Sequence, residues 1–331
     1  MLREDESDIR FLFHRFKIDR RVMFHHVAIN VNIFEQGKDV LIGLGENFDR
    51  FEITREEFES WIDIKKTGAK NIADVLRSVR QMMVAKDSKI MFKLILNVPE
   101  KKVLELLPEV HERDGLEVLN EKLSKGTINK IIDESSKLTY LSFPNLKFPK
   151  GFNHNQPIPC WDVTYGNAFW VKVDHILALR ESGTITLRNT DWHSQMINRL
   201  LVFWITADFR MFQRLRIHTR SKFLINKLFN GVETLQVDGS NDVMRNFHSR
   251  EGSSYFVILS TSMRIAFIQV ADKHFEMLTA LQGDYKEYAR MIIMLMEKRR
   301  KEKELRSLEE KLDNLNIQFS SGRAQMSNVQ Q

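Results

Sequence analysis

The chain between Thr184 and Thr219 begins with Thr184-Ile-Thr-Leu-Arg-Asn189, continues through Trp192 to Ile205, and closes with Phe212-Gln-Arg-Leu-Arg-Ile217. In the first and third segments apolar and polar residues alternate, which is typical of β-strands. In the middle segment the apolar residues recur every three or four positions and share one helical face: Met196, Ile197, Leu200, Leu201 and Trp204. A strand, a helix and a second strand within about thirty-five residues make one βαβ unit.

Similar strand and helix patterns alternate along most of the 331 residues. Near the start, alternating apolar residues predict three antiparallel strands, at 27–33, 40–44 and 51–53. Further patterns predict helices over 69–84, 99–108, 116–132 and 223–229, and strands over 90–98, 138–143, 234–237, 255–259 and 263–270. We therefore expect an α/β fold: a leucine-rich-repeat-like, degenerate βα repeat with a curved sheet and outer helices, N-terminal antiparallel strands and a long C-terminal helix.

The segment between Phe143 and Val171 is irregular and contains four of the six prolines together with several aromatic residues. Such a loop is either a packed cover over the core or an exposed recognition surface. Because large aromatic side chains are usually buried, we favour the packed cover.

A long helical pattern extends from Tyr285 to about Phe319. Within it, five apolar residues alternate spacings of three and four and form a heptad seam: Leu305, Leu308, Leu312, Leu315 and Phe319. Lys298 and Lys301 occupy the preceding seam positions. This seam favours, as an alternative function, a coiled-coil-linked structural or oligomerisation protein. Residues 320–331 are polar and are predicted to be disordered.

Composition and charge narrow the class of protein. The hydrophobic fraction is 43% and the aromatic fraction 10%, which indicates a globular rather than a disordered chain. The net charge is +6, and the run Lys298-Arg-Arg-Lys-Glu-Lys303 raises nucleic-acid binding as a third hypothesis. We favour a solvated helix face, because neighbouring glutamates dilute the charge, and expect no nucleic-acid partner.

The compartment is predicted from cysteine usage and hydropathy. Cys160 is the one cysteine, which excludes an internal disulfide and a Cys-rich metal site and fits a reducing environment. The first residues lack the apolar segment of a signal peptide, and no run reaches the length of a transmembrane helix. We expect an intracellular protein, cytoplasmic or nuclear, with no membrane contact.

No catalytic motif is found. The chain lacks a phosphate-binding glycine loop and an acyl-transfer serine elbow. His25 and His26 lie in an alternating segment, so their rings are expected on opposite faces, and Asp191-x-His193 fits a helix start better than a metal pair. We therefore expect no enzymatic activity, no cofactor and no bound metal.

The helix of the central unit carries a family resemblance. Ile197-Asn198-x-Leu200-Leu201-x-x-Trp204-Ile205 resembles the signature Leu-Asn-x-Phe-Leu-x-x-Trp-Ile of the nematode F-box-associated domain, type 2. The flanking strands match as well. Two later steps are similar to the family: Leu228-Phe-Asn-Gly231-Val232, and Phe247-His-Ser-Arg250-Glu251-Gly252 followed by Tyr255-Phe-Val. The matches cover residues 170–270.

The resemblance implies a non-catalytic protein-binding module, the substrate-recognition portion of an F-box-type ubiquitin ligase receptor that binds an unknown protein substrate. Proteins of this family usually begin with an F-box, a helical module that docks on the ligase adaptor. This chain has no Pro-rich, Leu-rich opening of that kind, so the F-box is missing or truncated and adaptor binding is not expected.

Pattern and resemblance together predict four parts: a short helix and F-box remnant over 1–20, an F-box-associated-like α/β domain over 21–283, the C-terminal helix over 284–319 and the disordered tail. The resemblance gives its motif residues structural roles, with Trp204 as a core anchor and Asn198 as a buried amide that ties a loop. The motif residues are Asn198, Leu201, Trp204, Ile205, Gly231, Arg250 and Gly252.

Overall fold

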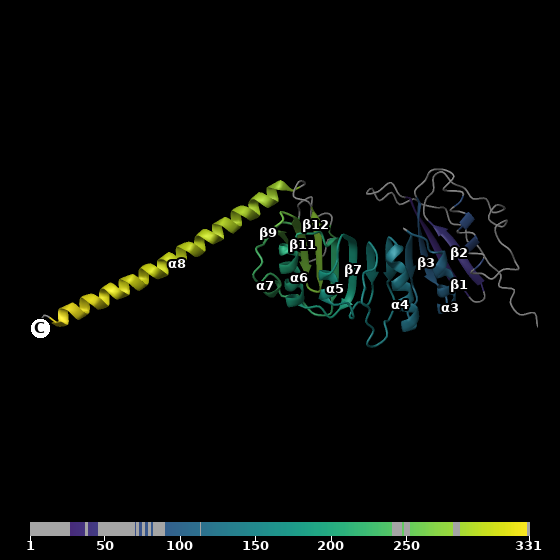
Figure 1. Cartoon of the computed structure of the whole chain (residues 1–331), viewed down its shortest axis with the longest axis horizontal. Helices are drawn as coiled ribbons and strands as arrows, with labels where there is room; N and C mark the ends of the chain where they lie inside the picture. The colour runs from purple at the N-terminus through teal and green to yellow at the C-terminus, as the bar shows by residue number, and fades with distance from the viewer. Residues whose placement is uncertain are drawn as a thin grey trace, which may run out of the picture.

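The computed structural model describes part of the chain: residues 27–36, 39–45, 70, 73–74, 77–78, 81, 90–112, 114–239, 247, 252–280 and 285–329. These residues form one sheet of twelve strands in the order β2-β1-β3-β4-β5-β6-β7-β8-β12-β11-β10-β9 (Figure 1). Helices alternate with the strands over the middle of the chain, and a long helix, α8, extends away from the body. The predicted α/β character is confirmed.

Six consecutive strands of the sheet are parallel, and each pairs with the next along the chain: β3 (Ile90–Asn97), β4 (Gly115–Val118), β5 (Tyr140–Phe143), β6 (Asp162–Tyr165), β7 (Ser182–Thr190) and β8 (Phe212–Thr219). Their register aligns one buried apolar row: Leu94, Leu116, Leu141, Val163, Ile185 and Leu215. The intervals along this row run from 22 residues (Leu94 to Leu116) to 30 residues (Ile185 to Leu215). Strands of similar pattern thus recur at irregular intervals.

The connecting helices pack on the apolar face of the sheet. They are α3 (Glu100–Leu106), α4 (Lys125–Glu134), α5 (Val173–Leu177), α6 (Ser194–Thr206) and α7 (Ile225–Leu228), with 3₁₀ turns at Leu107–Glu109 and Ser135–Lys137. Apolar residues from all five helices share one core with the aligned strand row. In α6 this face includes Leu200, Leu201 and Trp204, all at most 1% exposed. The strand–helix–strand unit predicted between Thr184 and Thr219 is confirmed as β7-α6-β8, and its strands are parallel.

The two ends of the sheet are antiparallel. At one end β1 (Val27–Gln36) pairs with β2 (Asp39–Gly45), as predicted, and β1 also pairs with β3 in parallel. At the other end the predicted hairpin is confirmed as β10 (Ser254–Leu259) with β11 (Ile265–Ala271), and β9 (Leu235–Val237) borders β10. A further strand, β12 (His274–Ala280), is not predicted; it lies between β8 and β11 and joins the parallel strands to this hairpin.

One predicted helix is wrong at its start. Residues 116–118 are not helical but belong to β4, and α4 begins only at Lys125. Leu116 and Val118 lie buried on one face of the sheet, where β3 and β5 supply their backbone hydrogen bonds. The helix begins where Ser124 accepts a hydrogen bond from the backbone N–H of Thr127, a regular N-cap.

Four aromatic residues between Phe143 and Val171 form a packed cover, whereas Trp161 in the same segment is 36% exposed. Phe148, Phe152, Tyr165 and Trp170 are at most 6% exposed, and their rings contact one another at centroid distances from 4.8 to 5.8 Å. The Tyr165 hydroxyl donates a hydrogen bond to the carbonyl oxygen of Pro157. The prediction of a buried cover is confirmed for these four rings, and β6 lies within the segment.

Helix α8 (Lys286–Val329) begins against the sheet and then leaves it (Figure 1). Ala289 and Ile292, both fully buried, pack with Val257, Ile265 and Phe267 of the terminal hairpin. The helix continues over 320–329, where a disordered tail is predicted; that segment contains no proline to end it. None of the helices in the described residues has the length and apolar character needed to span a membrane.

Several predictions fall outside the described residues. These are the short helix over 1–20, the strand at 51–53 and most of the helix over 69–84. The described positions of that last segment, among them Ala73 and Arg77, are helical.

Candidate functional site

The second face of the parallel sheet is polar. Because side chains alternate along a strand, each buried apolar residue is followed by one that points to the opposite face. Two register rows of polar residues result. One is Glu117, Ser142, Thr164, Thr186 and Arg216, and the other is Tyr140, Asp162, Thr184 and Arg214. We call these nine residues, together with Lys93 on β3 and Glu276 on β12, the polar face.

A first charged cluster lies at the β3–β5 end of the polar face. Lys93 Nζ lies 2.5 Å from Glu117 Oε2, and the Tyr140 hydroxyl donates to the same oxygen over 3.3 Å. The ammonium also lies 4.7 Å from the centroid of the Tyr140 ring. Burial raises the pKa of Tyr140, so the phenol stays protonated and acts as a donor.

A second cluster surrounds Asp162 in the middle of the face. Its carboxylate accepts a hydrogen bond from the backbone N–H of Thr184 on the neighbouring strand. The adjacent Gly183 leaves room for this contact, because a Cβ there would collide with the Trp161 indole and with the Asp162 carboxylate. Burial raises the pKa of Asp162. The carboxylate thus ties β6 to β7.

A third cluster joins the parallel strands to β12. Arg214 Nε lies 2.7 Å and Arg216 Nε 2.8 Å from Glu276 Oε1, while His274 Nε2 lies 3.3 Å from Glu276 Oε2. Burial acts to raise the pKa of Glu276, but hydrogen bonds from His274 and Arg216 and the charges of both arginines outweigh it. The pKa falls from 4.5 to about 2. Glu276 is therefore a buried carboxylate that holds two arginines in place.

The polar face combines partly exposed cations with carboxylates that are held by other groups. The side chains of its two arginines are each 22% exposed, and hydroxyls of Thr164, Thr184 and Thr186 lie on the neighbouring strands β6 and β7. Its carboxylates are engaged in ion pairs or in backbone contacts. Within the described ranges no group of three or more His, Cys, Asp or Glu side chains is arranged to hold a metal ion.

Cys160 is a buried thiol. The thiol is buried and donates a hydrogen bond to the carbonyl oxygen of Asp162 over 3.3 Å. Burial, with the nearby charge of Asp162, raises its pKa to about 12. Because the thiolate is the reactive form, this side chain is inert at neutral pH.

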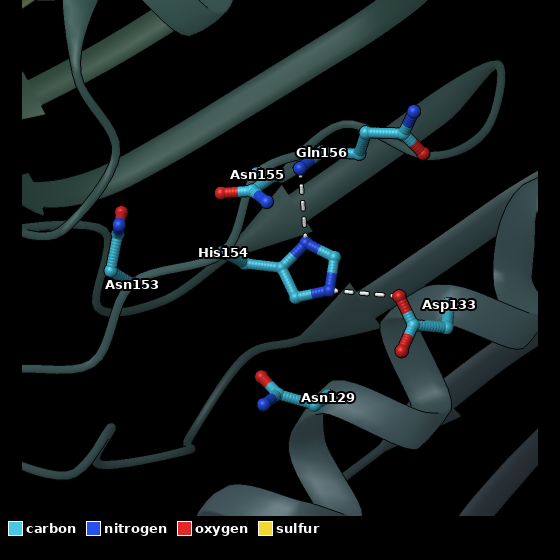
Figure 2. Close-up of a pocket in the computed structure, with 6 residues that line it drawn as sticks. All are labelled: Asn129, Asp133, Asn153, His154, Asn155 and Gln156. Carbon is cyan, nitrogen blue, oxygen red and sulfur yellow. Dashed lines mark hydrogen bonds and ion pairs between the residues drawn. The ribbon is translucent and has the colours of Figure 1, made fainter.

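A shallow pocket of about 440 Å³ lies on another part of the surface, between α4 and the aromatic segment (Figure 2). Its central residue is His154, whose Nε2 lies 3.0 Å from Asp133 Oδ1 and whose Nδ1 accepts the backbone N–H of Gln156 over 3.1 Å. Because Nδ1 is an acceptor, Nε2 carries the proton and donates to Asp133. Both ring nitrogens are engaged in hydrogen bonds within the protein.

The structure brings most of the predicted motif residues together around α6. Leu201 and Trp204 lie in the core, and Ile205 is half-buried beside it. The Asn198 amide donates to the carbonyl oxygens of Leu228 (3.0 Å) and Asn230 (2.8 Å), and so ties α6 to the turn that follows α7.

Glycines complete the motif. Gly231, in the turn held by Asn198, and Gly252, before β10, both have a φ of 71°, the left-handed region that favours glycine. Arg250 lies outside the described residues.

Three side chains that hold α6 and the polar face in place are not predicted from the sequence: Arg264, Arg216 and Glu276. Arg264 donates to the carbonyl oxygens of Ala207 and Phe209, and its guanidinium lies 5.5 Å from the centroid of a Trp204 ring. Arg216 and Glu276 are 60 positions apart. The sequence signal that could reveal Glu276 is the alternation of His274 and Glu276 with Phe275 and Met277, which is a strand pattern.

Comparison of the chain with protein-family models, with curated proteins and with solved structures finds no match.

Proposed function

We propose that this chain is a non-catalytic protein-binding module that binds its partner on the polar face. The observation that carries the proposal is the division of the parallel sheet: helices pack on its apolar face, while hydroxyls and charged groups from six neighbouring strands line the other. Half-buried side chains that are held by ion pairs lose little conformational freedom when they bind, which favours recognition of another protein.

The strand arrangement supports a leucine-rich-repeat-like reading of the fold. In such repeats each strand lies beside the next in the chain, and repeat lengths run from about 20 to 29 residues. The row from Leu94 to Leu215 has that strand order and intervals between 22 and 30 residues. The Asn120 and Asn189 amides also donate to carbonyl oxygens one strand back, those of Val98 and Gly166. The curvature of the sheet stays a prediction.

The resemblance to the F-box-associated domain makes the proposal more specific. It favours the substrate-recognition portion of a ubiquitin ligase receptor, acting in the cytoplasm or nucleus on a protein substrate. Trp204 is buried, as the resemblance implies, and Asn198 ties α6 to the turn after α7, with a side chain that is half-buried rather than buried. Docking on the ligase adaptor is not part of the proposal, since the chain contains no F-box pattern.

Nucleic-acid binding is less favoured. In the basic run of α8, Lys298 and Arg300 lie within 4.0 Å of Glu302 and Glu304, and Arg299 pairs with Glu233. These ion pairs offset much of the positive charge that phosphate binding requires.

Affinity capture of the full chain from cell extract, probed for the ligase adaptor and cullin and for other proteins, tests the proposal. Capture of a protein that then binds the purified chain in a titration supports a binding module. The additional presence of adaptor and cullin supports a receptor that docks without a regular F-box. A folded chain that retains no protein contradicts the proposal.

A further inference from the structure

The heptad seam of α8 is exposed. Leu305, Leu308 and Leu312 are 56%, 61% and 59% exposed, values far above those of leucines in the core. Continued toward the start of the helix, the same heptad spacing places Met294, which is 67% exposed, and Met291 in the seam. Because the backbone is helical to Val329, Leu315 and Phe319 occupy the next seam positions. Apolar residues therefore occupy the seam on both sides of Lys298 and Lys301.

The body of the protein does not cover this seam. Ile292 packs in the terminal core and Arg299 pairs with Glu233, so these two residues, seven positions apart, mark the side of α8 that faces the sheet. Successive helical residues are rotated by roughly 100°, which places Met291 and Met294 on the other side. Figure 1 shows the helix projecting from the body into solvent.

A helix of this kind needs a partner along its length. Its 44 residues span about 66 Å. In proteins most helical stability comes from packing of an apolar face. Contiguous exposed apolar surface on a protein marks an interaction site. The seam positions have the spacing of a coiled coil, so the expected partner is another helix with the same spacing.

The charges of α8 disfavour a parallel pair of copies. In a parallel dimer each seam residue faces its own copy, so Lys298 would meet Lys298 and Lys301 would meet Lys301. The flanking positions would also place Glu297 beside Glu302 and Glu304 beside Glu309 of the other helix. Like charges at these positions are destabilising.

An antiparallel arrangement removes the contacts between like lysines from the seam. If Leu308 faces Leu312 of the second copy, Leu305 faces Leu315, and Lys301 and Lys298 face Phe319 and Gly322. The remaining like-charge contacts, those of Glu309 and of Lys311 with their own copies, lie next to the two-fold axis. We propose that α8 binds α8 of a second copy of this chain as an antiparallel coiled coil centred between Leu308 and Leu312. This inference is independent of the proposed function.

Sedimentation of the full chain over a dilution series measures the association. The proposal predicts twice the monomer mass of 39.1 kDa for the wild type. Leu308→Glu should give the monomer mass, because a carboxylate enters the seam at both copies. Ser307→Glu, an exposed neighbour off the seam, should remain dimeric. Thermal unfolding confirms that each variant keeps its fold. A monomeric wild type at every concentration overturns the proposal.

Cysteine cross-linking determines the direction. Glu309→Cys lies next to its own copy only in the antiparallel arrangement, whereas Leu305→Cys faces itself only in the parallel one. Mild oxidation should link Glu309→Cys and leave Leu305→Cys unlinked. The native Cys160 is buried and does not compete. Linking of Leu305→Cys without Glu309→Cys overturns the antiparallel arrangement.

Discussion

Arg216 on β8 and Glu276 on β12 are register partners in the sheet, and Arg216 Nε lies 2.8 Å from Glu276 Oε1. Their strands are antiparallel, and this pair stands where the parallel part of the sheet ends. Arg214 approaches the same oxygen over 2.7 Å. The buried carboxylate therefore links the strand that was not predicted to the proposed binding surface, and it fixes the direction of both arginines.

Removal of the Glu276 charge should destabilise the protein strongly. Glu276→Gln keeps the size of the side chain but leaves two partly buried arginines without their counter-ion. Breaking such a pair costs about 3–5 kcal/mol in the free energy of unfolding. Urea unfolding of the variant and the wild type at neutral pH measures this loss of unfolding free energy. The matched control is Glu121→Gln, which removes the exposed ion pair with Lys147 and should cost far less. Equal costs for the two variants would refute the buried role of Glu276.

The same carboxylate predicts an acid-dependent loss of stability. The pKa of Glu276 is about 2 in the folded protein, whereas its ordinary value without these partners is 4.5. As pH falls, the unfolded chain therefore binds a proton at this carboxylate before the folded protein does. The contribution is therefore present above pH 4.5 and is lost progressively between pH 4.5 and about 2. Unfolding free energy measured against pH should fall less steeply over this range in Glu276→Gln than in the wild type. An equal slope in the variant and the wild type would show that folding does not lower the pKa of Glu276.

Trp204 should behave as a core residue. It is 1% exposed, and truncation of a buried tryptophan to alanine costs about 3–5 kcal/mol. Trp204→Ala should lower the free energy of unfolding by that amount. Val202→Ala, on the exposed side of the same helix, should have little effect. A thermal midpoint of Trp204→Ala equal to that of the wild type would rule out the anchoring role.

Asn198 should stabilise the turn after α7. Asn198→Ala removes two hydrogen bonds, to Leu228 and Asn230, each of which contributes about 0.5–1.5 kcal/mol. Hydrogen exchange should then quicken at residues 228–232 as well. Gln195→Ala, at an exposed position of α6, serves as the control. The prediction fails if both variants exchange at the same rate in this turn.

Local periodicity predicts the fold wherever one face of an element is apolar. Ile185 and Leu187 alternate as a strand must, and α6 repeats its apolar residues as a helix must, so β7-α6-β8 is found from the sequence. Leu116, Leu119 and Leu123 also satisfy a helical spacing, which explains the wrong helix there. Pairing with β3 and β5 decides for a strand, and the sequence does not show that pairing.

The candidate site is harder to predict because it arises between strands. Residues of the polar face alternate with those of the apolar row along each strand. Which of them become neighbours depends on the register of strand pairing, and the irregular intervals between strands hide that register in the sequence. Thr164, Thr186 and Arg216 become neighbours only through pairing of β6, β7 and β8. Glu276 reaches Arg214 from 62 positions away. Motif residues such as Asn198 and Gly231, which act within one loop, are within reach of sequence reasoning.

If the partner binds the polar face, substitution of one threonine on each side of the sheet should affect binding on one side only. Thr164→Arg places a bulky charge in the middle of the polar face, and Thr206→Arg makes the same change at the exposed end of α6 on the helical side. Both purified variants are titrated with the captured partner. We expect at least a tenfold loss of affinity, about 1.4 kcal/mol, for Thr164→Arg and wild-type affinity for Thr206→Arg. Wild-type affinity of Thr164→Arg, with its fold intact, would show that the partner does not bind the polar face.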